Sequence, residues 1–70
     1  MSAKLPVISG EQLIKILVRN GFSVRRQAGS HVVLQRAVIV FSVHLHDVLK
    51  KGTLKTILNQ SGLYVEDILQ

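Results

Sequence analysis

The stretch Gly29-Ser30-His31 joins three residue types that suit acid–base chemistry on a phosphate. Glycine permits a tight turn, a serine hydroxyl can hydrogen-bond an oxygen, and histidine exchanges protons near neutral pH because its unperturbed pKa is ~6.5. Guanidinium groups bind phosphate oxygens in pairs, and two arginines precede this stretch. His31 is therefore a candidate catalytic residue, although a lone histidine on a strand is more often an ordinary surface residue. The candidate phosphate-binding residues around it are Arg25, Arg26 and Ser30.

A second basic group lies further along the chain. Lys50, Lys51 and Lys55 surround Gly52-Thr53, where we expect a helix to begin. Basic side chains are slightly unfavourable at a helix N-terminus, so this grouping indicates an anion-binding site more than helix support. A solvated cluster of charges is the alternative.

Two further histidines, His44 and His46, would share one face of a continuing strand. This spacing can bind zinc, but the chain has no cysteine and only Asp47 is a nearby carboxylate. We therefore expect no metal and no cofactor. Both histidines remain possible secondary site residues, with polar loop positions as the simpler interpretation.

Length and charge limit the class of protein. The 70 residues predict a single domain spanning 1–70, and nine Lys and Arg against four Asp and Glu give a net charge of +5. That charge favours a polyanionic partner or an acidic protein surface. The longest apolar run, 37–41, is far shorter than the ~20 residues that cross a bilayer. We expect a soluble cytoplasmic protein with no membrane association.

The first element that positions these residues is a helix from Gly10 to Asn20. Ser9 and Gln12 have the spacing of a capping box, and Gly21 is suited to end the helix in the left-handed conformation. The expected buried stripe consists of Leu13, Ile14, Ile16, Leu17 and Val18.

The middle of the chain alternates with period two, which predicts a three-stranded antiparallel meander over 22–28, 31–35 and 38–45. A strict two-residue loop at Gly29-Ser30 would place Arg25 beside Leu34 and bury the wrong residues. We therefore expect an odd loop or a glycine bulge around 29–31. The solvent face would then carry Arg25, His31, Val33, Ser42 and His44, and the core face Phe22, Val24, Val32, Leu34, Ile39, Phe41, Val43 and Leu45.

The C-terminal part is predicted to be helical. Thr53 is a suitable N-cap for a helix over 54–61 that buries Leu54, Ile57 and Leu58, and Gly62 is suited to end it. A last helical turn over 65–69 would bury Ile68 or Leu69, and we expect Tyr64 to be partly buried. The resulting order is α-β-β-β-α, an α+β fold.

Three blocks of the chain follow one another in this order. They are Asn20-Gly21-Phe22, then Arg26-Gln27-Ala28-Gly29-Ser30-His31, and finally Lys51-Gly52-Thr53-Leu54-Lys55-Thr56-Ile57-Leu58 leading to Ser61-Gly62-Leu63. A histidine also ends the third predicted strand. Over about residues 10–69, these blocks resemble the HicA toxin family.

The resemblance implies a double-stranded-RNA-binding-domain-like fold, with a three-stranded antiparallel sheet and both helices on one face. It also implies a type II toxin, a metal-independent endoribonuclease that cleaves mRNA and is held inactive by a HicB-type antitoxin. The catalytic histidine of that family corresponds to His31. From their own chemistry and not from the resemblance, the residues expected to bind RNA or phosphate are Arg25, Arg26, Ser30, Lys50, Lys51 and Lys55.

Two other functions fit the same residues. A non-catalytic module would contact A-form RNA through its backbone and 2′-OH groups and would lose little on removal of the His31 imidazole. A protein that binds only another protein would show no salt-dependent affinity for RNA. If the toxin interpretation holds, we expect the antitoxin to cover the His31 face.

Overall fold

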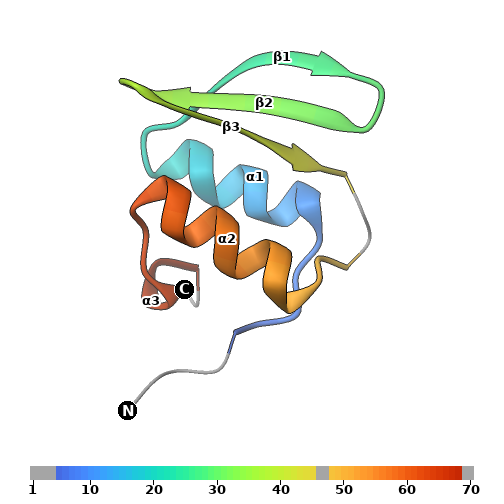
Figure 1. The fold of residues 1–70 in the computed structure, drawn as a ribbon, viewed down its shortest axis with the longest axis vertical. Coiled ribbons are helices and arrows are strands. Elements are labelled where there is room, and N and C mark those ends of the chain that lie inside the picture. Colours follow the sequence, from blue (N-terminus) through green and yellow to red (C-terminus); the bar gives the residue numbers. More distant parts are fainter. Residues whose placement is uncertain (1–4, 46–47, 69–70) are drawn as a thin grey trace.

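A three-stranded antiparallel sheet packs against helices in a computed structural model that describes residues 5–45 and 48–68 (Figure 1). In chain order the elements are α1 (Gly10–Arg19), β1 (Ser23–Ala28), β2 (His31–Arg36), β3 (Ile39–His44), α2 (Lys51–Ser61) and α3 (Val65–Ile68). The strand order is β1-β2-β3, so β2 is central. Helices α1 and α2 lie against one face of the sheet, and none of the described elements covers the other. The predicted α+β arrangement is confirmed.

Helix α1 begins and ends as its sequence predicts. The Ser9 hydroxyl accepts from the Gln12 amide at 3.1 Å, and the Gln12 side chain accepts from the Ser9 amide at 3.0 Å, which completes the capping box. Gly21 adopts a φ of +96° directly after the helix. The predicted burial of Val18 is wrong, since its side chain is 48% exposed. Val18 lies about 100° around the helix from Leu17, which turns it away from the sheet.

The β1–β2 hairpin does contain an irregularity, but not where we expected it. Gly29 and Ser30 form a strict two-residue turn that pairs Ala28 with His31. The extra residue is Arg25, a bulge that shifts the register so that Leu34 pairs with Val24. The predicted bulge around 29–31 is therefore wrong, because the correction is made four residues before the turn. The predicted burial of Val24 is also wrong, because its side chain is 50% exposed on an edge strand.

Strands β2 and β3 pair without interruption from His31 opposite His44 to Arg36 opposite Ile39. Their turn, Ala37-Val38, is again two residues long, and Ala37 has a φ of +54°. Ser42 and His44 are exposed, as predicted, but the predicted burial of Leu45 is wrong, since it is 36% exposed just past the end of β3.

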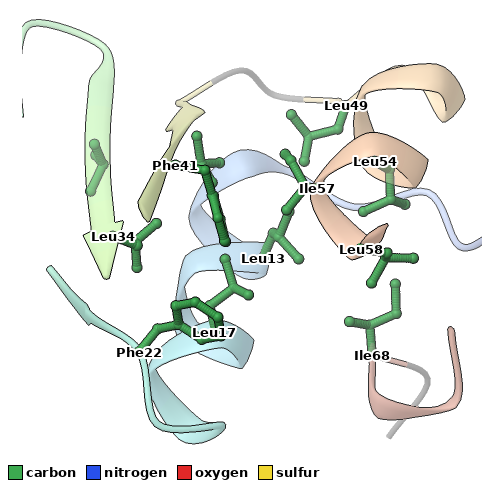
Figure 2. Close-up of a cluster of buried hydrophobic side chains, with 12 residues drawn as sticks. Leu13, Leu17, Phe22, Leu34, Phe41, Leu49, Leu54, Ile57, Leu58 and Ile68 are labelled. Atoms are coloured by element: carbon green, nitrogen blue, oxygen red, sulfur yellow. The ribbon is translucent and has the colours of Figure 1, made fainter. Parts of the chain in front are cut away.

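The core lies between the sheet and the helices (Figure 2). Every described element except β1 contributes to it, and Phe22, just before β1, packs its ring 5.3 Å from that of Phe41. The buried apolar residues are Leu13, Leu17, Phe22, Val32, Leu34, Phe41, Val43, Leu49, Leu54, Ile57, Leu58 and Ile68.

Helix α2 begins three residues earlier than predicted, at Lys51 rather than Leu54. Lys50 is the N-cap, with an extended backbone and no side-chain capping bond, so the prediction of Thr53 as the cap is wrong. The reason lies before the helix, where buried Leu49 donates its amide to the carbonyl of Ile8 at 2.9 Å. This anchor fixes the direction of the chain at residue 49 and lets the helix start at once.

The C-terminal turn of the fold follows the prediction more closely. Gly62 ends α2 with a φ of +76°, and Ile68 in α3 is buried. Leu69 lies outside the described residues. Tyr64 is 74% exposed, so its predicted partial burial is wrong.

Arg36, predicted to be part of a loop, instead connects three elements. Its guanidinium carbon lies 4.6 Å from the centre of the Phe22 ring. Its Nη1 donates to the carbonyl of Asn20 at 2.9 Å, and its Nη2 donates to the carbonyl of Ser61 at 3.1 Å. These carbonyls lie at the C-terminal ends of α1 and α2, where helix dipoles favour a cation. One side chain therefore joins both helices to the end of β2.

Replacing Gly10 with alanine should destabilise the protein. A Cβ at this position would overlap the carbonyl oxygen of His44, which is backbone and cannot rotate away. We expect Gly10→Ala to lower the free energy of unfolding by about 1–3 kcal/mol, despite alanine's higher helix propensity. Gly52→Ala is the matched control, because a Cβ there meets nothing within 4 Å; it should raise stability by up to ~1 kcal/mol. Urea denaturation measures both, and equal shifts would contradict the packing argument.

Arg36 should contribute more to stability than any exposed arginine. Arg36→Met keeps the aliphatic stem but removes two hydrogen bonds and the cation–π contact, so we expect a loss of about 2–4 kcal/mol in chemical denaturation. The exposed Arg26→Met should change stability by less than ~0.5 kcal/mol. Similar values for the two variants would show that the Arg36 contacts contribute nothing.

Candidate functional site

Two histidines face each other across adjacent strands. His31 begins β2, His44 ends β3, and the two are direct cross-strand partners. Their ring centres are 4.0 Å apart, with the planes at 74° in an edge-to-face arrangement. Both residues are exposed on the sheet face that the helices leave open. Two imidazoles at this separation can exchange protons with the same bound group.

The turns and pairings around these histidines hold their backbones in place. The amide of Leu45 donates to the carbonyl of Ser30 at 2.8 Å, which continues the β2–β3 pairing past the ends of both strands. On the other side of His44, Gly10 of α1 packs directly against the strand backbone. The imidazoles therefore project from a backbone that is fixed on two sides.

The bulge decides which arginine accompanies the histidines. Alternate residues of a strand share a face, and Arg26 pairs with Val33, two residues beyond His31. Arg26 is therefore a diagonal neighbour of His31 on the open face. Arg25 is exposed, as predicted, but occupies the bulge rather than a paired position. Ser30 is exposed in the turn next to His31.

The three candidate lysines do not form one cluster. A groove of about 930 Å³ lies between β3 and α2, and Lys50 lines it together with His44. Lys55 lines a second groove of about 360 Å³, beside Tyr64. Lys51 is exposed at the first residue of α2 and lines neither groove. Only Lys50 thus shares a surface depression with one of the two histidines.

Polar side chains of α2 that the sequence interpretation did not single out also line the larger groove. Thr53, Thr56 and Gln60 share one side of the helix and line the groove together with Ser42 and His44 of β3. Their spacing of three and four residues in the sequence could have predicted one polar side of this helix. What the sequence did not indicate is that this face borders the end of β3.

Metal binding finds no support among the residues that the structure describes. Within 5–45 and 48–68, no group of three or more His, Cys, Asp or Glu side chains is placed to hold a metal ion. His46 and Asp47 lie outside these residues. No helix in the same ranges is both long and apolar enough to span a bilayer.

The chain matches a known protein family over most of its length. A family described as the HicA toxin of bacterial toxin-antitoxin systems matches residues 10–63, which include both histidines and the larger groove. Neither the curated proteins nor the solved structures contain a significant match.

Proposed function

Because the chain belongs to the HicA toxin family of bacterial toxin-antitoxin systems, we propose that it is a toxin that cleaves mRNA at the paired histidines, with His31 as the catalytic residue. A HicB-type antitoxin neutralises it. The observation that carries this proposal is the His31–His44 pair, with ring centres 4.0 Å apart on the uncovered face of the sheet.

RNA supplies its own nucleophile, which suits a site built from imidazoles. The ribose 2′-OH attacks the adjacent phosphorus, a base removes its proton, and an acid protonates the leaving 5′ oxygen. The products are a 2′,3′-cyclic phosphate and a free 5′-OH. Histidine can act as either acid or base, and each such transfer typically contributes 10²- to 10⁴-fold. His31 and His44 divide these two transfers, and His46 remains a secondary candidate.

The charge around the pair favours a polyanion. Arg26 lies diagonally to His31, and Arg25, Ser30 and Lys50 are exposed nearby in the fold. Guanidinium groups can hold the phosphate oxygens and stabilise the additional negative charge of the phosphorane. The net charge of +5 draws RNA to the protein before any specific contact forms. Lys51 and Lys55 extend the proposed basic surface away from the histidines.

Replacing His31 with alanine should abolish RNA cleavage and growth arrest. His31 is exposed, so the variant should keep the parent's circular dichroism and unfolding midpoint. We expect cleavage of a single-stranded RNA to fall by at least ~10²-fold. A bacterial host producing the variant should grow normally, and co-production of a HicB-type antitoxin should restore growth in cells producing the parent.

Parent-like toxicity of the folded variant would overturn the assignment of His31. Loss of cleavage without loss of RNA affinity is the expected pattern for a catalytic residue. If the parent and the His31→Ala variant both arrest growth and neither cleaves RNA, the non-catalytic RNA-binding module is favoured instead.

Arg26 and Lys55 provide a second test, because each carries one positive charge but only Arg26 shares the His31 face. Arg26→Ala should weaken RNA binding and reduce the slope of log K against log salt by about one. Lys55→Ala should change the slope less. Titrations at several salt concentrations with the inactive His31→Ala protein measure both, and a larger effect from Lys55 would move the binding surface to the other groove.

A further inference from the structure

Polar side chains outnumber apolar ones among the residues that line the groove between β3 and α2. The polar residues that line it are Ser42 and His44 from β3, Lys50 before α2, and Thr53, Thr56 and Gln60 from α2. None of the described residues that line it is acidic. Its volume of about 930 Å³ falls within the range of small-molecule sites.

The groove combines an apolar base with hydrogen-bonding walls. Val48, which is 59% exposed, lines it together with the buried Leu49 and Ile57 and offers an apolar surface against which a flat ring can rest. The Thr56 hydroxyl donates to the carbonyl of Gly52 at 2.9 Å, so its lone pairs remain to accept from a ligand. Gln60 is exposed and presents both a carbonyl and an NH₂ group, the combination that recognises the edge of a base.

His44 connects this groove to the proposed reaction centre. Its ring is 4.0 Å from that of His31, and His44 is also one of the residues that line the groove. An RNA whose scissile phosphate lies at the histidine pair must continue in two directions. One direction crosses the open sheet face toward Arg26, and the other enters the groove past His44.

We propose that the groove binds the ribose and base next to the scissile phosphate of a single-stranded RNA, and that Gln60 reads the base. This inference rests on the proposed function and names the part of the fold that selects the cleavage site. Gln60 is a specificity-determining residue, whereas the two histidines perform the proton transfers. A base held in this groove is unstacked from its neighbours, which restricts the substrate to single-stranded RNA.

Gln60 and Asn59 form a matched pair for the test. They are adjacent on α2, both are exposed amides, and Asn59 lines the smaller groove instead. Cleavage is measured on RNAs that differ at the positions flanking the cleavage site. Gln60→Ala should raise KM for the preferred RNA about fivefold to tenfold, and it should reduce the difference in cleavage between bases at those positions. Its kcat should stay within about threefold. Asn59→Ala should match the parent in both parameters; equal behaviour of the two variants would overturn the proposal.

A binding measurement separates failure of this inference from failure of the proposed function. The folded His31→Ala protein is titrated with a short single-stranded RNA while its backbone amide signals are followed by NMR. Shifts at Thr53, Thr56 and Gln60, all on α2, support the groove whether or not the parent cleaves RNA. Shifts confined to the open sheet face, or to Asn59 and Tyr64, would reject the groove and leave cleavage by His31 intact. If the groove signals do not shift with RNA but do shift when a HicB-type antitoxin is added, the groove binds protein instead.

Discussion

The interaction on which the rest of this fold depends is the insertion of the Arg36 guanidinium between the C-terminal ends of two helices. It satisfies one carbonyl from α1 and one from α2 while resting on the ring of Phe22. Both helices end at glycines with positive φ, Gly21 and Gly62, and neither presents a Cβ to the arginine. Each helix end therefore depends on the same charge, and that charge is carried by β2. In so small a chain, this one side chain links both helix ends to the sheet beside the apolar core.

The same strand carries the proposed chemistry at its other end. β2 runs from His31 to Arg36, so the residue that joins the helices and the residue that we assign to catalysis are the two ends of one six-residue element. Between them, Val32 and Leu34 enter the core while Val33 and Gln35 stay on the open side. The orientation of the face that carries His31 thus follows from the packing of the opposite face, because the side chains of a strand alternate.

Features that depend on neighbouring residues could be predicted from the sequence. The capping box at Ser9, the helix end at Gly21 and the three-stranded meander all arise within a few positions, and the structure contains each of them. Features that depend on distant contacts could not. The start of α2 is set by the bond between Leu49 and Ile8, and the role of Arg36 by carbonyls 16 and 25 residues away. Neither contact leaves a local pattern.

The candidate site divides in the same way. The residue type and turn around His31 indicated acid–base chemistry, and the family match agrees with the resemblance found in the sequence. The partnership with His44 required the β2–β3 register, and the choice of Arg26 over Arg25 as the neighbour required the position of the bulge. A shift of one residue reverses the faces of a strand, so the surroundings of a site on a sheet are the part least accessible to pattern alone.

The contact between Gly10 and the backbone of His44 makes position 10 informative when related sequences are compared. Any side chain there would push the end of β3 away from α1 and change the spacing of the two imidazoles, since His44 is carried on that strand end. Glycine at position 10 is therefore compatible with the paired-histidine geometry, and a larger residue is not compatible with this contact as the chain makes it.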